Sequence, residues 1–126
     1  MSLKAYASRI FLLGMIPESY RFLRAFDIYV LPSYEECFSL SLLDAQLAAL
    51  PVVGSQSGGT PEVVREGETG WLFQPKDAQS LREKLHLALD EAHFWRLYGD
   101  AARHRAEGEF DQETIFGEIL RNYDAR

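Results

Sequence analysis

Short apolar runs that alternate with helical patterns constrain the fold of this chain more than any other feature of its sequence. The runs are too short for helices, and they are apolar almost throughout, as in strands that are covered on both faces of a sheet. They span residues 9–14, 28–32, 51–55 and 71–73. This alternation predicts an α/β fold with a partial, Rossmann-like, doubly wound parallel sheet of about four strands, followed by C-terminal helices.

The segments between and after the apolar runs have the spacing and the end residues of helices. In residues 39–49 leucines recur at helical spacing, and we expect this stripe to face the core. These leucines, with the one that follows the helix, are Leu40, Leu43, Leu47 and Leu50. Thr60 is expected as the N-cap and Pro61 as the first residue of a short helix. Further helices are expected over residues 17–26 and from residue 77 onward, with a break near Gly99 or Gly108.

Charge and cysteine content limit the partners of the chain. The formal net charge of −6 at pH 7 argues against nucleic acid or an anionic membrane as the main partner, because both need a positive surface. The basic trio 103–105 lies in an acidic stretch and is interpreted as a solvated helix face. One cysteine, Cys37, excludes an internal disulfide and a multi-cysteine metal site. The 126 residues fit one domain, and a reducing, cytoplasmic compartment is expected.

Polar residues follow two of the expected strands at the edge where doubly wound sheets bind ligands. They lie in the loops 33–39 and 55–62. Glu36 precedes the helix and Asp44 lies within it, so eight residues at 1.5 Å each separate them by roughly 12 Å. That length suits a hexose at one end and a ribose at the other, with a diphosphate between them.

The diphosphate would lie against the unpaired N–H groups at the start of this helix, which form a natural anion site. These are the amides around Cys37, Phe38, Ser39 and Leu40. Taken singly, each candidate has an ordinary interpretation: Glu36 as a loop acid, Asp44 as a solvent-facing helix residue, and Gly58-Gly59 as a common turn. Their joint occurrence, in order and on the ligand edge, favours a binding site.

The segment 32–64 carries a resemblance to a known family. It reads PSYEECFSLSLLDAQ and, after one residue, AALPVVGSQSGGTPEVV. This segment resembles the retaining glycosyltransferases of family 4 (group 1), which have the GT-B fold with two Rossmann-like domains. Their signature is a loop acid, a small-Phe-small triplet, a second acid eight positions after the first, a Pro-Val-Val strand and a Gly-Gly-x-x-Glu turn. The resemblance runs from Arg9 to about Tyr123.

The resemblance implies a role for each candidate residue. Glu36 is the catalytic candidate and would bind hydroxyls of the donor sugar, while Asp44 would hold the ribose. The Gly58-Gly59-Thr60 turn would approach the sugar-phosphate region, where a side chain on either glycine would intrude. Cys37 and Ser39 stand where the family usually has glycine, Asp44 where it has glutamate, and Leu50 where a glycine often precedes the strand.

The resemblance also implies what the whole enzyme does. It would transfer a sugar from a nucleoside diphosphate sugar to a carbohydrate or lipid-linked acceptor, with retention, in polysaccharide, lipopolysaccharide or glycolipid synthesis. No cofactor beyond this co-substrate and no metal is expected. The enzyme would be cytoplasmic or peripheral to the inner membrane face. The alternatives are a GT-B epimerase or sugar-phosphate synthase, and a non-catalytic Rossmann-like interaction module.

Residues 1–126 would then be one partial domain, the C-terminal part of the donor-binding domain. The acceptor domain and the Arg and Lys that grip the diphosphate would precede it, so the chain alone is expected to be inactive. In the strand order 3-2-1-4-5-6, strands 9–14 and 28–32 are not neighbours, which leaves one side of 28–32 open. We expect either residues 9–14 to pair there or a second copy of the chain to do so, giving a homodimer.

Overall fold

Three parallel strands form the centre of the molecule. The computed structural model describes residues 3–110, and it has strands β1 (Tyr29–Leu31), β2 (Val52–Ser55) and β3 (Gly70–Phe73) in the order β1-β2-β3. Tyr29 pairs with Val52, and Val52 with Gly70. The α/β class with a parallel sheet is therefore confirmed, with three strands in the described residues.

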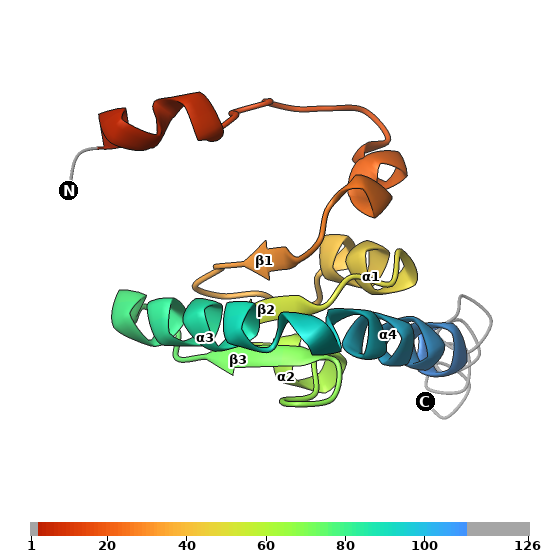
Figure 1. Cartoon of the computed structure of the whole chain (residues 1–126). Coiled ribbons are helices and arrows are strands. Elements are labelled where there is room, and N and C mark those ends of the chain that lie inside the picture. The colour runs from red at the N-terminus through yellow and green to blue at the C-terminus, as the bar shows by residue number, and fades with distance from the viewer. Residues whose placement is uncertain (1–2, 111–126) are drawn as a thin grey trace.

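Helices precede, connect and follow the strands (Figure 1). The α-helices are α1 (Leu40–Leu47), α2 (Thr60–Val63), α3 (Ala78–Asp90) and α4 (Trp95–Glu109). The 3-10 helices are η1 (Leu3–Arg9), η2 (Ser19–Ala25) and η3 (Ala92–Phe94). Among the described residues, none of these helices combines the length and the apolar character that a membrane crossing requires.

Both faces of the sheet are covered, because successive side chains of a strand point to opposite sides. On β2, Val52 packs with residues of α1 and α2, while the next residue, Val53, packs with residues of α3 and α4. The first cluster consists of Leu31, Leu42, Ala45, Leu50, Val52, Val63 and Val64. The second consists of Val53, Trp71, Phe73, Ala88 and Tyr98. This two-sided burial is the doubly wound arrangement expected from the continuous apolar runs.

The prediction of a strand at residues 9–14 is wrong. This segment arches away from β1 (Figure 1), and the side chains of Phe11 and Leu12 are 75% and 95% exposed. A strand is stable only when its backbone groups pair with a neighbour, and the described residues place no strand beside it. The expected pairing of residues 9–14 with β1 is wrong for the same reason, so one edge of β1 is open within the described chain.

The expected helices also need correction at their ends. Residues 17–26 form only the 3-10 helix η2, preceded by Glu18 in the left-handed region with φ of 55°. The C-terminal helical stretch breaks at Glu91, where α3 ends, and not at either glycine. Gly99 instead lies buried inside α4, where a Cβ atom would overlap the carbonyl oxygen of Ala49. It permits close packing of α4 on the chain after α1.

Helix α1 buries a different face from the one predicted. Leu40 is 72% exposed and Leu47 is 40% exposed, so only half of the leucine stripe faces the core. The buried residues of the helix are Leu42, Leu43, Ala45 and Gln46. Because α1 packs both on the sheet and on α4, its buried face is broad and includes a polar side chain that hydrophobic spacing does not indicate.

Candidate functional site

The N-terminus of α1 is fixed by a chain of hydroxyl groups. Ser39 is buried and caps the helix, because its Oγ accepts a hydrogen bond from the Leu42 amide at 3.2 Å. The Ser39 Oγ lies 2.9 Å from the Ser41 Oγ, which accepts a hydrogen bond from the Tyr29 hydroxyl at 2.8 Å. Since Tyr29 belongs to β1, these contacts hold the start of the helix against the sheet.

Main-chain N–H groups are available just before this helix. Within residues 3–110, the amides of Cys37, Phe38 and Ser39 donate to no protein acceptor. Consecutive unpaired amides at a helix N-terminus attract an anion, because their dipoles add to that of the helix. The Cys37 thiol and the Leu40 side chain are exposed, and the Phe38 ring lies 6.0 Å from that of Phe110. The loop is therefore open to solvent at its tip.

The two expected ligand loops touch each other through their backbones. The Gly59 amide donates a hydrogen bond to the Glu36 carbonyl oxygen at 2.9 Å. A Cβ atom on Gly58 would overlap that same carbonyl, and one on Gly59 would overlap the Cys37 carbonyl. The contact between the loops therefore explains both glycines, a reason that the sequence did not indicate. Their approach to a sugar phosphate stays a prediction.

Thr60 has a different role from the one predicted. Gly59 is the N-cap of α2, and Thr60 is the first helical residue. Its side chain is 2% exposed, and a Cβ atom on Gly54 would lie 2.8 Å from its methyl group. The prediction of Thr60 as N-cap is wrong because the side chain turns inward and packs on β2. The hydroxyl is buried without a hydrogen-bond partner among the described residues.

The two acidic candidates lie in different surroundings. Asp44 is half-buried and lines a cavity of about 720 Å³ between α1, β1 and residues 13–26. Among the described residues that line this cavity, Asp44 is the one charged residue, and Glu36 is not part of the lining. Glu36 is half-buried in the loop after β1. Binding of one ligand by both acids stays a prediction.

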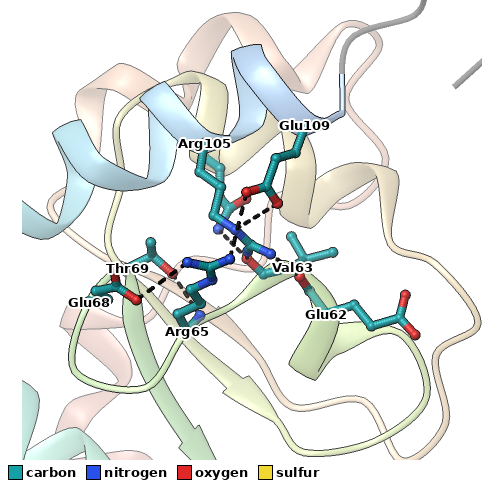
Figure 2. Close-up of polar contacts among 8 residues, drawn as sticks. Glu62, Val63, Arg65, Glu68, Thr69, Arg105 and Glu109 are labelled. Carbon is teal, nitrogen blue, oxygen red and sulfur yellow. Dashed lines mark hydrogen bonds and ion pairs between the residues drawn. The ribbon is translucent and has the colours of Figure 1, made fainter. Parts of the chain in front are cut away.

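Arg105 and Gln46 hold the second loop in place, and sequence reasoning missed both. The Arg105 guanidinium donates hydrogen bonds to the main-chain oxygens of Glu62 and Val63, at the end of α2 (Figure 2). The buried Gln46 amide donates to the Val63 oxygen as well, at 3.1 Å. The interpretation of residues 103–105 as a solvated helix face is wrong for Arg105, whose side chain is 13% exposed. No side-chain pattern could have indicated partners that are backbone atoms.

Comparison with known proteins identifies the family to which this chain belongs. The family model for glycosyl transferases group 1 matches residues 1–91. The chain belongs to the group 1 glycosyltransferases. N-acetyl-alpha-D-glucosaminyl L-malate synthase of Bacillus anthracis is 30% identical over 121 residues, which cover 90% of this chain and 32% of that protein. D-inositol 3-phosphate glycosyltransferase of Thermobifida fusca is 32% identical over 108 residues, which cover 86% of this chain and 25% of that protein.

Solved glycosyltransferases of the GT-B fold share the architecture of this group 1 chain. Sucrose-phosphate synthase of Thermosynechococcus elongatus matches with a TM-score of 0.84 and 30% identity, over 98% of this chain and 33% of that one. Anabaena HepE in complex with UDP matches with a TM-score of 0.86 and 24% identity, over 97% and 34%. This chain thus spans about a third or less of the proteins it matches here.

Proposed function

We propose that this chain forms part of the sugar-donor site of a retaining, family 4 glycosyltransferase that uses a nucleoside diphosphate sugar. The observation that carries the proposal is the Ser39-capped helix start with unpaired amides at Cys37 and Phe38. It lies after β1, at the carboxyl edge of the sheet, in a group 1 glycosyltransferase chain. A diphosphate is the anion that such a site in such a family would bind.

The proposed roles of the two acids follow the direction of α1. Glu36 lies before the unpaired amides and would accept hydrogen bonds from hydroxyls of the donor sugar. Asp44 lies one turn into the helix, beside the apolar cavity, and would accept hydrogen bonds from the ribose hydroxyls. Two structures of Anabaena HepE, with UDP and with UDP-glucose, match the fold with TM-scores of 0.86 and 0.85 and support this class of ligand.

In the proposed reaction, the bond between the anomeric carbon and the diphosphate oxygen breaks, and the acceptor hydroxyl oxygen bonds to the same face of the sugar. The proton of that hydroxyl passes to the departing diphosphate. Negative charge develops on the leaving diphosphate, where amides at Cys37, Phe38, Ser39 and Leu40 would stabilise it without an essential metal. The acceptor, a carbohydrate or a lipid-linked sugar, would bind to a domain outside these residues. The chain alone would therefore be inactive. The complete enzyme would work in the cytoplasm or at the inner membrane face, in the synthesis of a polysaccharide, lipopolysaccharide or glycolipid.

A second candidate is a sugar-phosphate synthase that uses the same donor. The match to sucrose-phosphate synthase, at 30% identity over 98% of this chain, favours it. The two candidates share the donor site and differ in the acceptor.

Saturation-transfer NMR with UDP, GDP and ADP sugars tests the proposal. We expect transfer to the anomeric and ribose protons of at least one donor, weakened in Glu36→Ala and in Asp44→Ala. Glu35→Ala is the matched control, because Glu35 is the exposed neighbour of Glu36. Equal signals in all three variants, or none with any donor at millimolar concentration, would contradict the proposed site.

A further inference from the structure

The carbonyl groups at the end of α2 are held by side chains from two other helices. The Val63 oxygen accepts hydrogen bonds from Gln46 of α1 and from Arg105 of α4, and the Glu62 oxygen accepts a second bond from Arg105. Figure 2 shows the guanidinium directed at both oxygens. The planar guanidinium presents several donors in a fixed fork, so that one side chain can bind two adjacent carbonyl groups.

Arg105 is itself held in position by an acid on its own helix. The Arg105 Nε atom lies 3.0 Å from Glu109 Oε2, within ion-pair distance but out of line for a hydrogen bond. Glu109 is also 3.7 Å from the Arg65 guanidinium, which pairs with Glu68 at 3.8 Å (Figure 2). The charge of Arg105 is thus compensated, and its low exposure is consistent with a fixed orientation.

These contacts reach the candidate donor site through a short stretch of backbone. Helix α2 begins directly after Gly59, whose amide binds the Glu36 carbonyl. Gln46 lies two residues beyond Asp44 on α1. A four-residue helix has little stability of its own, so its position depends on what holds its ends. Arg105 holds the end opposite the Gly58-Gly59 turn.

We propose that Arg105 is a positioning residue for the donor site: its bonds to the Glu62 and Val63 carbonyls fix α2 and thereby keep the Gly58-Gly59 turn against the loop of Glu36. The effect of Arg105 on donor binding rests on the proposed function, whereas its effect on the position of the turn does not. The two effects are measured separately.

Amide hydrogen exchange of the 126-residue chain tests the effect on the turn. In Arg105→Met we expect exchange at the Gly59 and Val64 amides, at the two ends of α2, to accelerate about tenfold, because the helix loses the charged hydrogen bonds that fix it. The amides of the β2 ladder should be unchanged. Arg103→Met is the matched control, since Arg103 is on the same helix and pairs with Glu107 at 2.8 Å on an exposed face. Unchanged exchange, a uniform acceleration, or the same acceleration in the control would overturn the proposal.

A second variant keeps the test valid if Arg105→Met does not fold. Arg105→Lys keeps the charge but replaces the fork by a point donor. We expect Gly59 protection in Arg105→Lys to fall below that of the wild type, with the amides of the β2 ladder unchanged. Full wild-type protection of the Gly59 amide in Arg105→Lys would contradict the proposal that the contact with two carbonyl groups fixes the turn.

An NMR titration with UDP tests the link to the donor site. We expect Arg105→Met to raise the Kd for UDP about fivefold or more, and Arg103→Met to leave it unchanged. A loosened turn with unchanged UDP affinity would overturn the role of Arg105 in positioning the donor site. If the wild-type chain shows no UDP-induced shifts, the proposed function fails, and the exchange data alone decide the role of Arg105 at the turn.

Discussion

The main-chain oxygen of Glu36 accepts a hydrogen bond from the Gly59 amide at 2.9 Å. This bond joins the loop that follows β1 to the turn that follows β2. Both segments lie at the carboxyl edge of the sheet, where parallel α/β folds bind ligands. The catalytic candidate thus depends, for its backbone position, on a glycine 23 residues later in the chain.

We expect Gly58→Ala to destabilise the chain by at least about 2 kcal/mol, because its φ of 52° disfavours a side chain and the new Cβ atom would overlap the Glu36 carbonyl. Gly108→Ala is the control. Gly108 lies in α4, and its Cβ atom would meet no atom within 4 Å, so the variant should gain about 0.5–1 kcal/mol from helix propensity. Urea unfolding measures both. A Gly58→Ala variant as stable as the wild type would contradict the contact between the loops.

In the complete enzyme, Glu36→Ala should lower kcat/KM. We expect the ratio to correspond to a loss of about 2–4 kcal/mol of transition-state stabilisation, as for the loss of a positioned polar contact. Glu35→Ala should change it little, because this neighbouring carboxylate is exposed. Steady-state kinetics with the donor identified by NMR measure the effect. Unchanged kinetics in Glu36→Ala would show that the Glu36 side chain has no role in the donor site.

The chain alone should bind nucleoside diphosphates no tighter than about millimolar, because charge-assisted hydrogen bonds contribute about 1.5–3 kcal/mol each and few are available. No Arg or Lys occurs in residues 25–64, so this segment supplies no cationic side chain to bind the diphosphate beside the unpaired amides. Calorimetry with UDP measures the affinity. A micromolar Kd would contradict the expectation and would point to a cation elsewhere, such as Lys76, whose Nζ lies 6.0 Å from the Tyr34 ring.

Stability should decline above pH 10 through Tyr98. Burial raises the pKa of its hydroxyl above the ordinary value of 10.0, and the carboxylates of Glu91 and Glu66 raise it further. Because the pKa is higher in the folded than in the unfolded state, this contribution is constant below pH 10 and is lost as pH rises toward the folded-state pKa. Tyr98→Phe should flatten this part of the profile in urea unfolding between pH 8 and 11, and Tyr20→Phe, at an exposed site, should not. If the stability of Tyr98→Phe declines as much as that of the wild type, the decline comes from other groups.

The open edge of β1 should make the chain self-associate at high concentration. Since the Tyr29 amide donates to Pro51 of the sheet, the next amide, that of Val30, faces the open edge. Val30→Pro should reduce association, because it removes that donor while the bonds to β2 remain. Light scattering over a range of concentrations measures the mass. A strict monomer would contradict the homodimer.

The sequence predicted β1, β2 and β3 because their apolar side chains pack on both faces of the sheet, which leaves a continuous apolar pattern, although Tyr29 and Val30 of β1 are only half-buried. Residues 9–14 have the same pattern and form no strand, because pairing depends on a neighbour that local sequence does not record. The sequence singled out the glycines at 58 and 59 for a close approach to a sugar phosphate, and that approach stays a prediction. Their partner, a carbonyl in another loop, was identified only by the structure.

The contact of Arg105 with two carbonyl oxygens has an evolutionary consequence. Any residue at position 62 or 63 supplies the same main-chain acceptor, so these positions can change without affecting the chemistry that Arg105 recognises. Covariation between two positions arises when both side chains matter, and here only one does. Related sequences should therefore show a restricted choice at position 105, with no correlated change at 62 or 63.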